Sequence, residues 1–251
     1  MDPRITLLKK FYSTMQKDKI KLESNCYGFE FLNTLLSHDI KLEYGELTSS
    51  LIHKYKLVNI PEYRMDTLLQ GHINKYYNVC LYFDEMANNI FCFNLDNNFK
   101  ENNTALIPEM QYAVTKLTKH LTELGIEPLV IVSGRGYHVW CRLYEPIDNK
   151  QLHNFMLQMV AKTLEALHIK GYNYNRVKFN MYPNNEIINT VSLRFFGSEH
   201  VKNKIFSYVY VNSSVLGEED SWKFFADYLK NKTISKEQFM QAADKLARYF
   251  K

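Results

Sequence analysis

The sequence predicts an α+β fold, with a mixed or antiparallel sheet flanked by helices. Two observations lead to this class. Helical patterns open and close the chain, and between them short apolar strands alternate with two long amphipathic helices, an order typical of α/β and α+β domains. Tight polar turns also separate consecutive strands, and such turns can join antiparallel strands but not parallel ones. With 46% hydrophobic and 14% aromatic residues, the chain can build a packed core.

Helical spacing dominates the first part of the chain. Residues 4–17 carry apolar side chains three or four positions apart, which predicts a helix. Residues 29–36 and 45–55 are interpreted as two further helices. Residues 1–70 are therefore expected to form a helical N-terminal part of the core.

Two β-hairpins are predicted in the middle of the chain. Apolar runs at 79–83 and 90–95 are separated by the polar residues 84–89, which indicates a first hairpin. A second apolar run, 129–132, breaks into Ser-Gly-Arg-Gly and continues as a strand over 137–143. Glycine is the strongest signal for such a turn.

Two strong helices and several later strands complete the pattern. One helix opens at Pro108 and ends at Gly125, and the other is capped by Asp148 and stops near Gly171, in keeping with Pro and Asp at helix starts and Gly at helix ends. Residues 71–215 are expected to form the main core of the protein and 216–251 a C-terminal helical segment. The remaining expected elements are strands at 177–181, 191–195 and 205–211 and two amphipathic helices over 221–250, split near 233–235.

Composition limits the classes of protein that remain. A length of 251 residues suits one large domain or two small ones. The formal charge of +4 is compatible with nucleic-acid binding without being evidence for it. The four cysteines are scattered, with no CxxC pair, which disfavours a zinc module and indicates reduced thiols in a cytoplasmic setting. No signal peptide or membrane span is expected, because no apolar run approaches about 20 residues.

The turn at residues 133–136 carries the strongest chemical signal. Its two glycines let the backbone come close to a ligand, Arg135 offers a fork of donors, and His138 follows just beyond. Such a set can hold a polyphosphate. The alternative is a tight hairpin whose polar residues face water, because short glycine motifs have many false positives.

Three motifs in order resemble the archaeo-eukaryotic primase superfamily, which includes primase-polymerases. That family has a strand ending in Asp-x-Asp, then Ser-Gly-x-Gly-x-His before an apolar strand, then an acidic residue on a strand followed by Arg. Here the first motif corresponds to residues 91–96 and the second, a close match, to 133–140. The third corresponds to 177–183 followed by 193–202.

The resemblance implies a sheet of the RNA-recognition-module type and template-directed nucleotidyl transfer. The substrates would be NTP or dNTP on a single-stranded DNA template, and a helicase or another replication protein could be a partner. Carboxylates of the family hold two divalent metals, Mg²⁺ or Mn²⁺, so Asp96 would bind metal. The resemblance assigns triphosphate binding to Ser133, Arg135, His138, Arg194 and Lys202.

The departures from the family pattern concern the metal site. The first Asp of Asp-x-Asp is Asn94 here, and the third acidic position aligns with Asn180. Mg²⁺ prefers anionic oxygens, so a catalytic set of Asp96, Asn94 and Asn180 is depleted. Three accounts follow: a natural weak or inactive relative, a deliberately inactivated form of an active enzyme, or a different alignment. In the third account the missing charge would come from Asp84, Glu85 or Glu186.

Three classes of function are therefore compared. Nucleotidyl transfer, weakened or abolished by the two amides, is the leading one. The alternative is a non-catalytic nucleotide- and DNA-binding primase-like subunit. A plain single-strand-binding module would explain the sheet and its aromatic residues, but it would leave the Ser-Gly-Arg-Gly-Tyr-His turn without a role.

Overall fold

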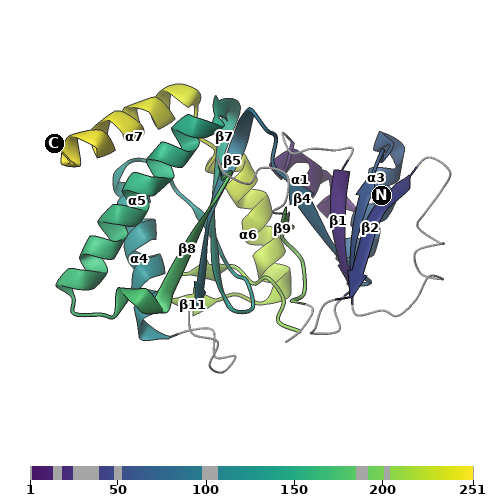
Figure 1. Cartoon of the computed structure of the whole chain (residues 1–251), viewed down its shortest axis with the longest axis horizontal. Helices are drawn as coiled ribbons and strands as arrows, with labels where there is room; N and C mark the ends of the chain where they lie inside the picture. The colour runs from purple at the N-terminus through teal and green to yellow at the C-terminus, as the bar shows by residue number, and fades with distance from the viewer. Residues whose placement is uncertain are drawn as a thin grey trace. The chain divides into compact units, whose positions relative to one another are not determined.

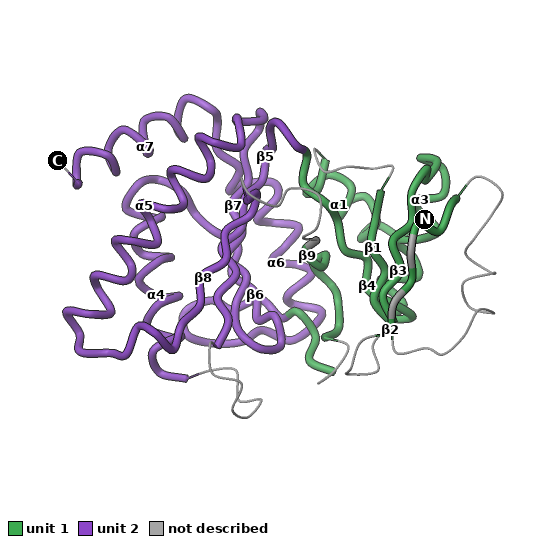
Figure 2. Tube along the Cα trace, in the orientation of Figure 1, with its two compact units in different colours: residues 1–84, 187–207 green, residues 85–186, 208–251 purple. Residues whose placement is uncertain are grey.

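The chain folds into two units that interleave in the sequence. The computed structural model describes residues 2–13, 19–24, 40–47, 53–97, 107–184, 192–200 and 204–250. Unit 1 comprises Met1–Asp84 and Ile187–Ser207, and unit 2 comprises Glu85–Glu186 and Tyr208–Lys251 (Figure 2). Within the described segments, no helix has the length and apolar character needed to cross a membrane.

Unit 1 is built on a five-stranded sheet in the order β2-β3-β1-β4-β9 (Figure 1). Each of its strand pairs is antiparallel. Its elements are α1 (Pro3–Phe11), β1 (Lys19–Ser24), β2 (Lys41–Leu47), β3 (His53–Val58), α3 (Glu62–Ile73), β4 (Asn78–Tyr82) and β9 (Ser192–Arg194).

The prediction of a helical N-terminal part is wrong in the described residues. The helix expected at 4–17 is present only over Pro3–Phe11, as α1, and residues 14–17 are not described; 45–55 contributes to β2 and β3 instead of a helix. Tyr55 and Leu57 are buried while their neighbours in β3 are not, a period of two that marks a strand with one covered face. The helix expected at 29–36 lies outside the described residues.

Unit 1 also contains two elements that the sequence analysis did not identify. In β1, buried and partly exposed residues alternate strictly, and this strand pairs with both β3 and β4. The helix α3 follows Pro61 and buries Met65, Leu68, Leu69 and Ile73, a spacing that fits one helix face.

His72, in the last turn of α3, is fully buried and hydrogen-bonded at both ring nitrogens. Its Nδ1 accepts from the Val79 backbone N–H at 3.2 Å, and its Nε2 donates to the Phe196 carbonyl at 3.0 Å. Burial, the largest cause, lowers the pKa of His72 to about 4; the hydrogen bond to Phe196 opposes this shift and the Arg194 cation contributes to it. The neutral imidazole therefore ties α3 to β4 and to the residues that follow β9.

We expect His72 to make the stability of the protein depend on pH. Its pKa of about 4 in the folded state lies below the ordinary 6.5, so the unfolded chain binds a proton first as pH falls. The contribution of neutral His72 to the free energy of unfolding is complete above pH 6.5. It decreases by about 3 kcal/mol as the pH falls from 6.5 to 4. Urea unfolding at several pH values should show that His72→Gln lacks this component, whereas the exposed control His168→Gln retains it. An identical pH profile for wild type and His72→Gln would contradict the assignment.

Unit 2 is built on a four-stranded sheet in the order β6-β7-β5-β8, again with antiparallel pairs. In Figure 1, α5 and α7 lie on one side of these strands and α6 on the other. Its elements are β5 (Ala87–Asn97), α4 (Pro108–Glu123), β6 (Leu129–Val132), β7 (Gly136–Asp148), α5 (Asn149–Ile169), the 3₁₀ helix η1 (Tyr174–Arg176), β8 (Val177–Tyr182), β10 (Tyr210–Val211), β11 (Ser214–Val215), α6 (Glu218–Asn231) and α7 (Lys236–Tyr249).

The helices of unit 2 match the sequence prediction because their end signals are local. Asp148 accepts from the backbone N–H groups of Lys150 and Gln151 at the start of α5. Ser235 forms a capping box with Gln238 at the start of α7. Gly125 and Gly171, after α4 and α5, both have positive φ, the conformation that glycine adopts at helix ends.

The first predicted hairpin is wrong. β4 pairs with β1 and β9, whereas β5 pairs with β7 and β8, so the two strands belong to different sheets. The chain passes from unit 1 to unit 2 between Asp84 and Glu85. The strand expected at 205–211 is likewise found only in part, as β10 and two isolated bridges, because the chain returns to unit 2 there.

Candidate nucleotide-binding site

The Ser-Gly-Arg-Gly turn joins β6 and β7 as a tight hairpin. The Ser133 N–H donates to the Gly136 carbonyl at 2.8 Å, and Ser133 is buried. Gly134 has φ +91°, a conformation that residues with a side chain rarely adopt. Arg135, at the tip, is exposed. The prediction of a hairpin at this position is confirmed.

Gly136 is required for a different reason. A methyl group at this position would overlap the backbone carbonyl oxygen of Leu95 on the neighbouring strand and would also crowd the Met110 sulfur. Because the closest obstacle is backbone, no side-chain rotation could relieve it. The two glycines of the turn therefore serve separate purposes: Gly134 allows the bend, and Gly136 allows β5 and β7 to approach.

Polar side chains from three strands form two rows across the sheet. In the first row, Asn94 of β5 lies opposite His138 of β7 and opposite Asn180 of β8. In the second row, Asp96 lies opposite Gly136 and opposite Lys178. Directly opposed residues share a face, with Cβ atoms about 4.5–5.5 Å apart. Asn94 and Asp96 therefore lie on the strand next to that of Asn180 and share its face of the sheet.

Asn94 is the centre of this arrangement. Its side chain is only 8% exposed, and its Nδ2 donates to Asp96 Oδ2 at 3.0 Å. Its Oδ1 is buried and has no hydrogen-bond partner among the described residues. A buried acceptor without a donor is costly, so this oxygen is suited to a donor supplied by water or by a bound ligand.

The structure adds two residues that the sequence analysis did not single out. Lys178 and Tyr182 flank Asn180 at intervals of two on β8, so they share its face. Burial raises the pKa of the Tyr182 phenol to about 12, and the nearby Cys92 and Asp96 add to that shift, whereas a hydrogen bond from Asn94 opposes it. The period of two around Asn180 is the signal that could have identified both residues.

The residues of this face do not fit a pair of divalent metal ions. Within the two described rows, Asp96 is the one carboxylate, and its Oδ2 already accepts a hydrogen bond from Asn94. Opposite Asp96 stands the cation Lys178. No group of three His, Cys, Asp or Glu side chains suited to a metal occurs among the described residues. Mg²⁺ binds through anionic oxygens, and this donor set carries one negative charge and one positive charge.

The other expected site residues lie elsewhere. Arg194 is on β9 of unit 1, opposite Cys80, whereas Ser133, His138 and Asp96 belong to unit 2. Lys202 and Glu186 lie outside the described residues. Asp84 and the exposed Glu85 occupy the connection between the units.

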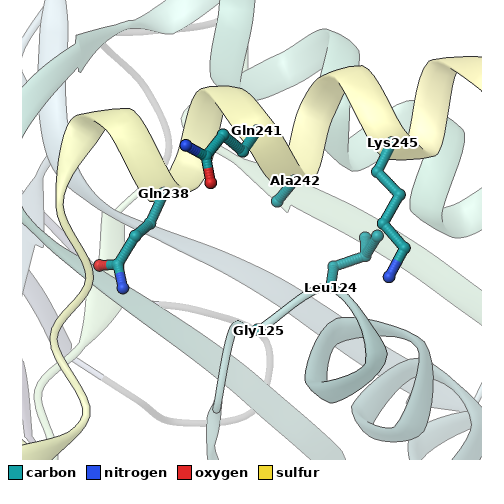
Figure 3. A pocket seen from close by; sticks show the side chains of 6 residues that line it. All are labelled: Leu124, Gly125, Gln238, Gln241, Ala242 and Lys245. Atoms are coloured by element: carbon teal, nitrogen blue, oxygen red, sulfur yellow. The ribbon is translucent and has the colours of Figure 1, made fainter.

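A shallow cavity in unit 2 lies apart from the motif residues. It is formed where residues of α7 face Leu124 and Gly125 at the end of α4 (Figure 3). Lys245 Nζ donates to the Glu123 carbonyl at 2.9 Å. This contact caps the carboxyl end of α4, so we interpret the cavity as a feature of helix packing. Its lining residues are Leu124, Gly125, Gln238, Gln241, Ala242 and Lys245.

The antiparallel sheet with helices on both sides, and the Ser-Gly-Arg-Gly-Tyr-His hairpin that contributes to its polar rows, are those of a domain of the primase-polymerase class. Within that class, the chain belongs to the family described as "TOTE conflict system, Archaeo-Eukaryotic Primase domain", whose model matches residues 47–241. The resemblance found in the sequence is thereby confirmed.

Among solved structures, several chains are similar to this one. The polymerase domain of ligase D from Mycobacterium tuberculosis, determined in complex with DNA, is similar with a TM-score of 0.45 and 10% sequence identity. The similarity covers 97% of this chain and 87% of that chain. No curated protein matches the sequence.

Proposed function

We propose that this domain binds a nucleoside triphosphate, NTP or dNTP, together with a single-stranded DNA template, and that it transfers nucleotides slowly or not at all. The observation that carries the proposal is the row His138–Asn94–Asn180, in which two amides stand where the family resemblance expects carboxylates. The turn at 133–136, which the family uses for the nucleotide, keeps its serine and both glycines. Family membership supports DNA as the template.

The chemistry expected of each group follows from its charge. Ser133 and His138 can donate to phosphate oxygens, and Arg135, Arg194 and Lys202 can neutralise them. The primer hydroxyl would have to be activated by Mg²⁺ or Mn²⁺ bound to carboxylates, and the amides at 94 and 180 supply no negative charge for that purpose. In this proposal nucleotide binding is retained and transfer is impaired, and the complete loss of transfer would make the domain a non-catalytic nucleotide- and DNA-binding subunit.

Binding of nucleotide should depend on Arg194. A charge-assisted hydrogen bond to phosphate contributes about 1.5–3 kcal/mol, so we expect Arg194→Ala to weaken triphosphate binding at least about tenfold. Calorimetric titration with a nucleoside triphosphate measures this directly. The control is Arg248→Ala, which removes an exposed guanidinium from α7. An unchanged dissociation constant for Arg194→Ala would contradict a role of Arg194 in nucleotide binding, and unchanged thermal stability of the variant is the control that it still folds.

A further inference from the structure

Two cations stand on either side of Asp96 at one end of the unit 2 sheet. Lys178 of β8 is the direct cross-strand partner of Asp96. On the other side the partner is Gly136, and Arg135 precedes it at the tip of the turn. Both Lys178 and Arg135 are exposed. In the described part of the chain, neither side chain takes part in an ion pair.

Asp96 does not neutralise the two cations by ion pairing. No ion pair joins Lys178 to that carboxylate within the described residues, although the two are cross-strand partners, and Asp96 Oδ2 accepts from Asn94 Nδ2 at 3.0 Å. Lys178, Arg135 and Asp96 together carry two positive charges and one negative charge. An ammonium and a guanidinium beside a glycine turn favour the binding of an anion with several oxygens. They disfavour the binding of an additional cation, such as a metal ion, at the same place.

We propose that Lys178, together with Arg135, binds the triphosphate of the nucleotide without any divalent metal. This inference rests on the proposed nucleotide-binding function and names the group that makes binding metal-independent. The ligand is a triphosphate and not the phosphodiester backbone of DNA, because Lys178 and the residue after Arg135 are both direct cross-strand partners of Asp96, at one end of the sheet, and are not spread along it.

The test is calorimetric titration of the full chain in excess EDTA and, separately, in Mg²⁺. The probes are inorganic triphosphate, a nucleoside triphosphate and a single-stranded oligonucleotide. The variants are Lys178→Met and the charge-retaining Lys178→Arg. The matched control is Lys170→Met, which removes an equally exposed lysine at the end of α5.

We expect wild type to bind both triphosphate probes in EDTA, with a dissociation constant within about threefold of that in Mg²⁺. Lys178→Met should weaken this binding at least about tenfold. The dissociation constants of Lys178→Arg and Lys170→Met should stay near that of wild type. Binding by wild type that requires Mg²⁺ would overturn the inference and leave the proposed function standing. The inference would also be overturned if Lys178→Met weakened binding of the oligonucleotide but not of the triphosphate probes. Failure of wild type to bind triphosphate under either condition would instead refute the proposed function.

Discussion

Restoring two carboxylates should turn the protein into a measurable polymerase. We expect the double variant Asn94→Asp with Asn180→Asp to extend a primer at least about 100-fold faster than wild type, because positioned charge supplies most of the rate in this kind of transfer. Both positions lie on the face that carries Asp96, on adjacent strands, so the variant would place three carboxylates together. Asn180→Glu in place of Asn180→Asp tests whether a longer side chain is needed.

The measurement is gel-resolved primer extension and dinucleotide synthesis, with Mg²⁺ and with Mn²⁺. We expect Mn²⁺ to give the larger increase, since Mg²⁺ demands near-ideal octahedral geometry. The control is Asn173→Asp with Asn175→Asp, which adds the same charge on exposed residues around η1. Robust Mg²⁺-dependent synthesis by wild type would show that other carboxylates serve the reaction. If neither protein synthesises but both bind triphosphate, the domain is a non-catalytic subunit.

Gly136→Ala should be the most destabilising single change in the nucleotide turn. The added methyl group would meet the Leu95 carbonyl oxygen, so β5 and β7 would have to separate at the end that carries Asp96 and Arg135. Forcing an extra methyl into a closely packed site costs about 1–3 kcal/mol. Because the obstacle here is backbone, we expect a loss of about 3 kcal/mol or more in the free energy of unfolding, together with loss of triphosphate binding.

Urea unfolding monitored by circular dichroism measures the first effect and calorimetry the second. Gly217→Ala is the matched control, because an added Cβ there has no neighbour within 4 Å and the backbone has φ −66°. We expect that control to change the free energy of unfolding by less than about 1 kcal/mol. Wild-type stability in Gly136→Ala would mean that the two strands are not held as close as the structure describes.

Signals contained in one segment were sufficient for several elements of the fold. The helix α4 begins at Pro108 and ends before Gly125, and α5 follows Asp148 and ends before Gly171. The glycine turn predicted the β6–β7 hairpin. These signals work because caps and turns are satisfied by residues a few positions away. In β1 the apolar residues Ile20 and Leu22 alternate with lysines and a glutamate, which is an equally local signal for a strand. The strand was not predicted because this short segment contains more polar and charged residues than apolar ones.

Some features of the candidate site likewise follow from the sequence, and others follow only from the tertiary structure. The sequence by itself determined the three motifs, the family, and the replacement of two carboxylates by Asn94 and Asn180. Only the tertiary structure decided that Asn94 donates to Asp96, that Lys178 stands opposite Asp96, and that β4 and β5 belong to different sheets. The physical reason is that strand pairing joins residues far apart in the chain, so register, which sets the partner of every side chain, is decided by long-range packing and not by local sequence.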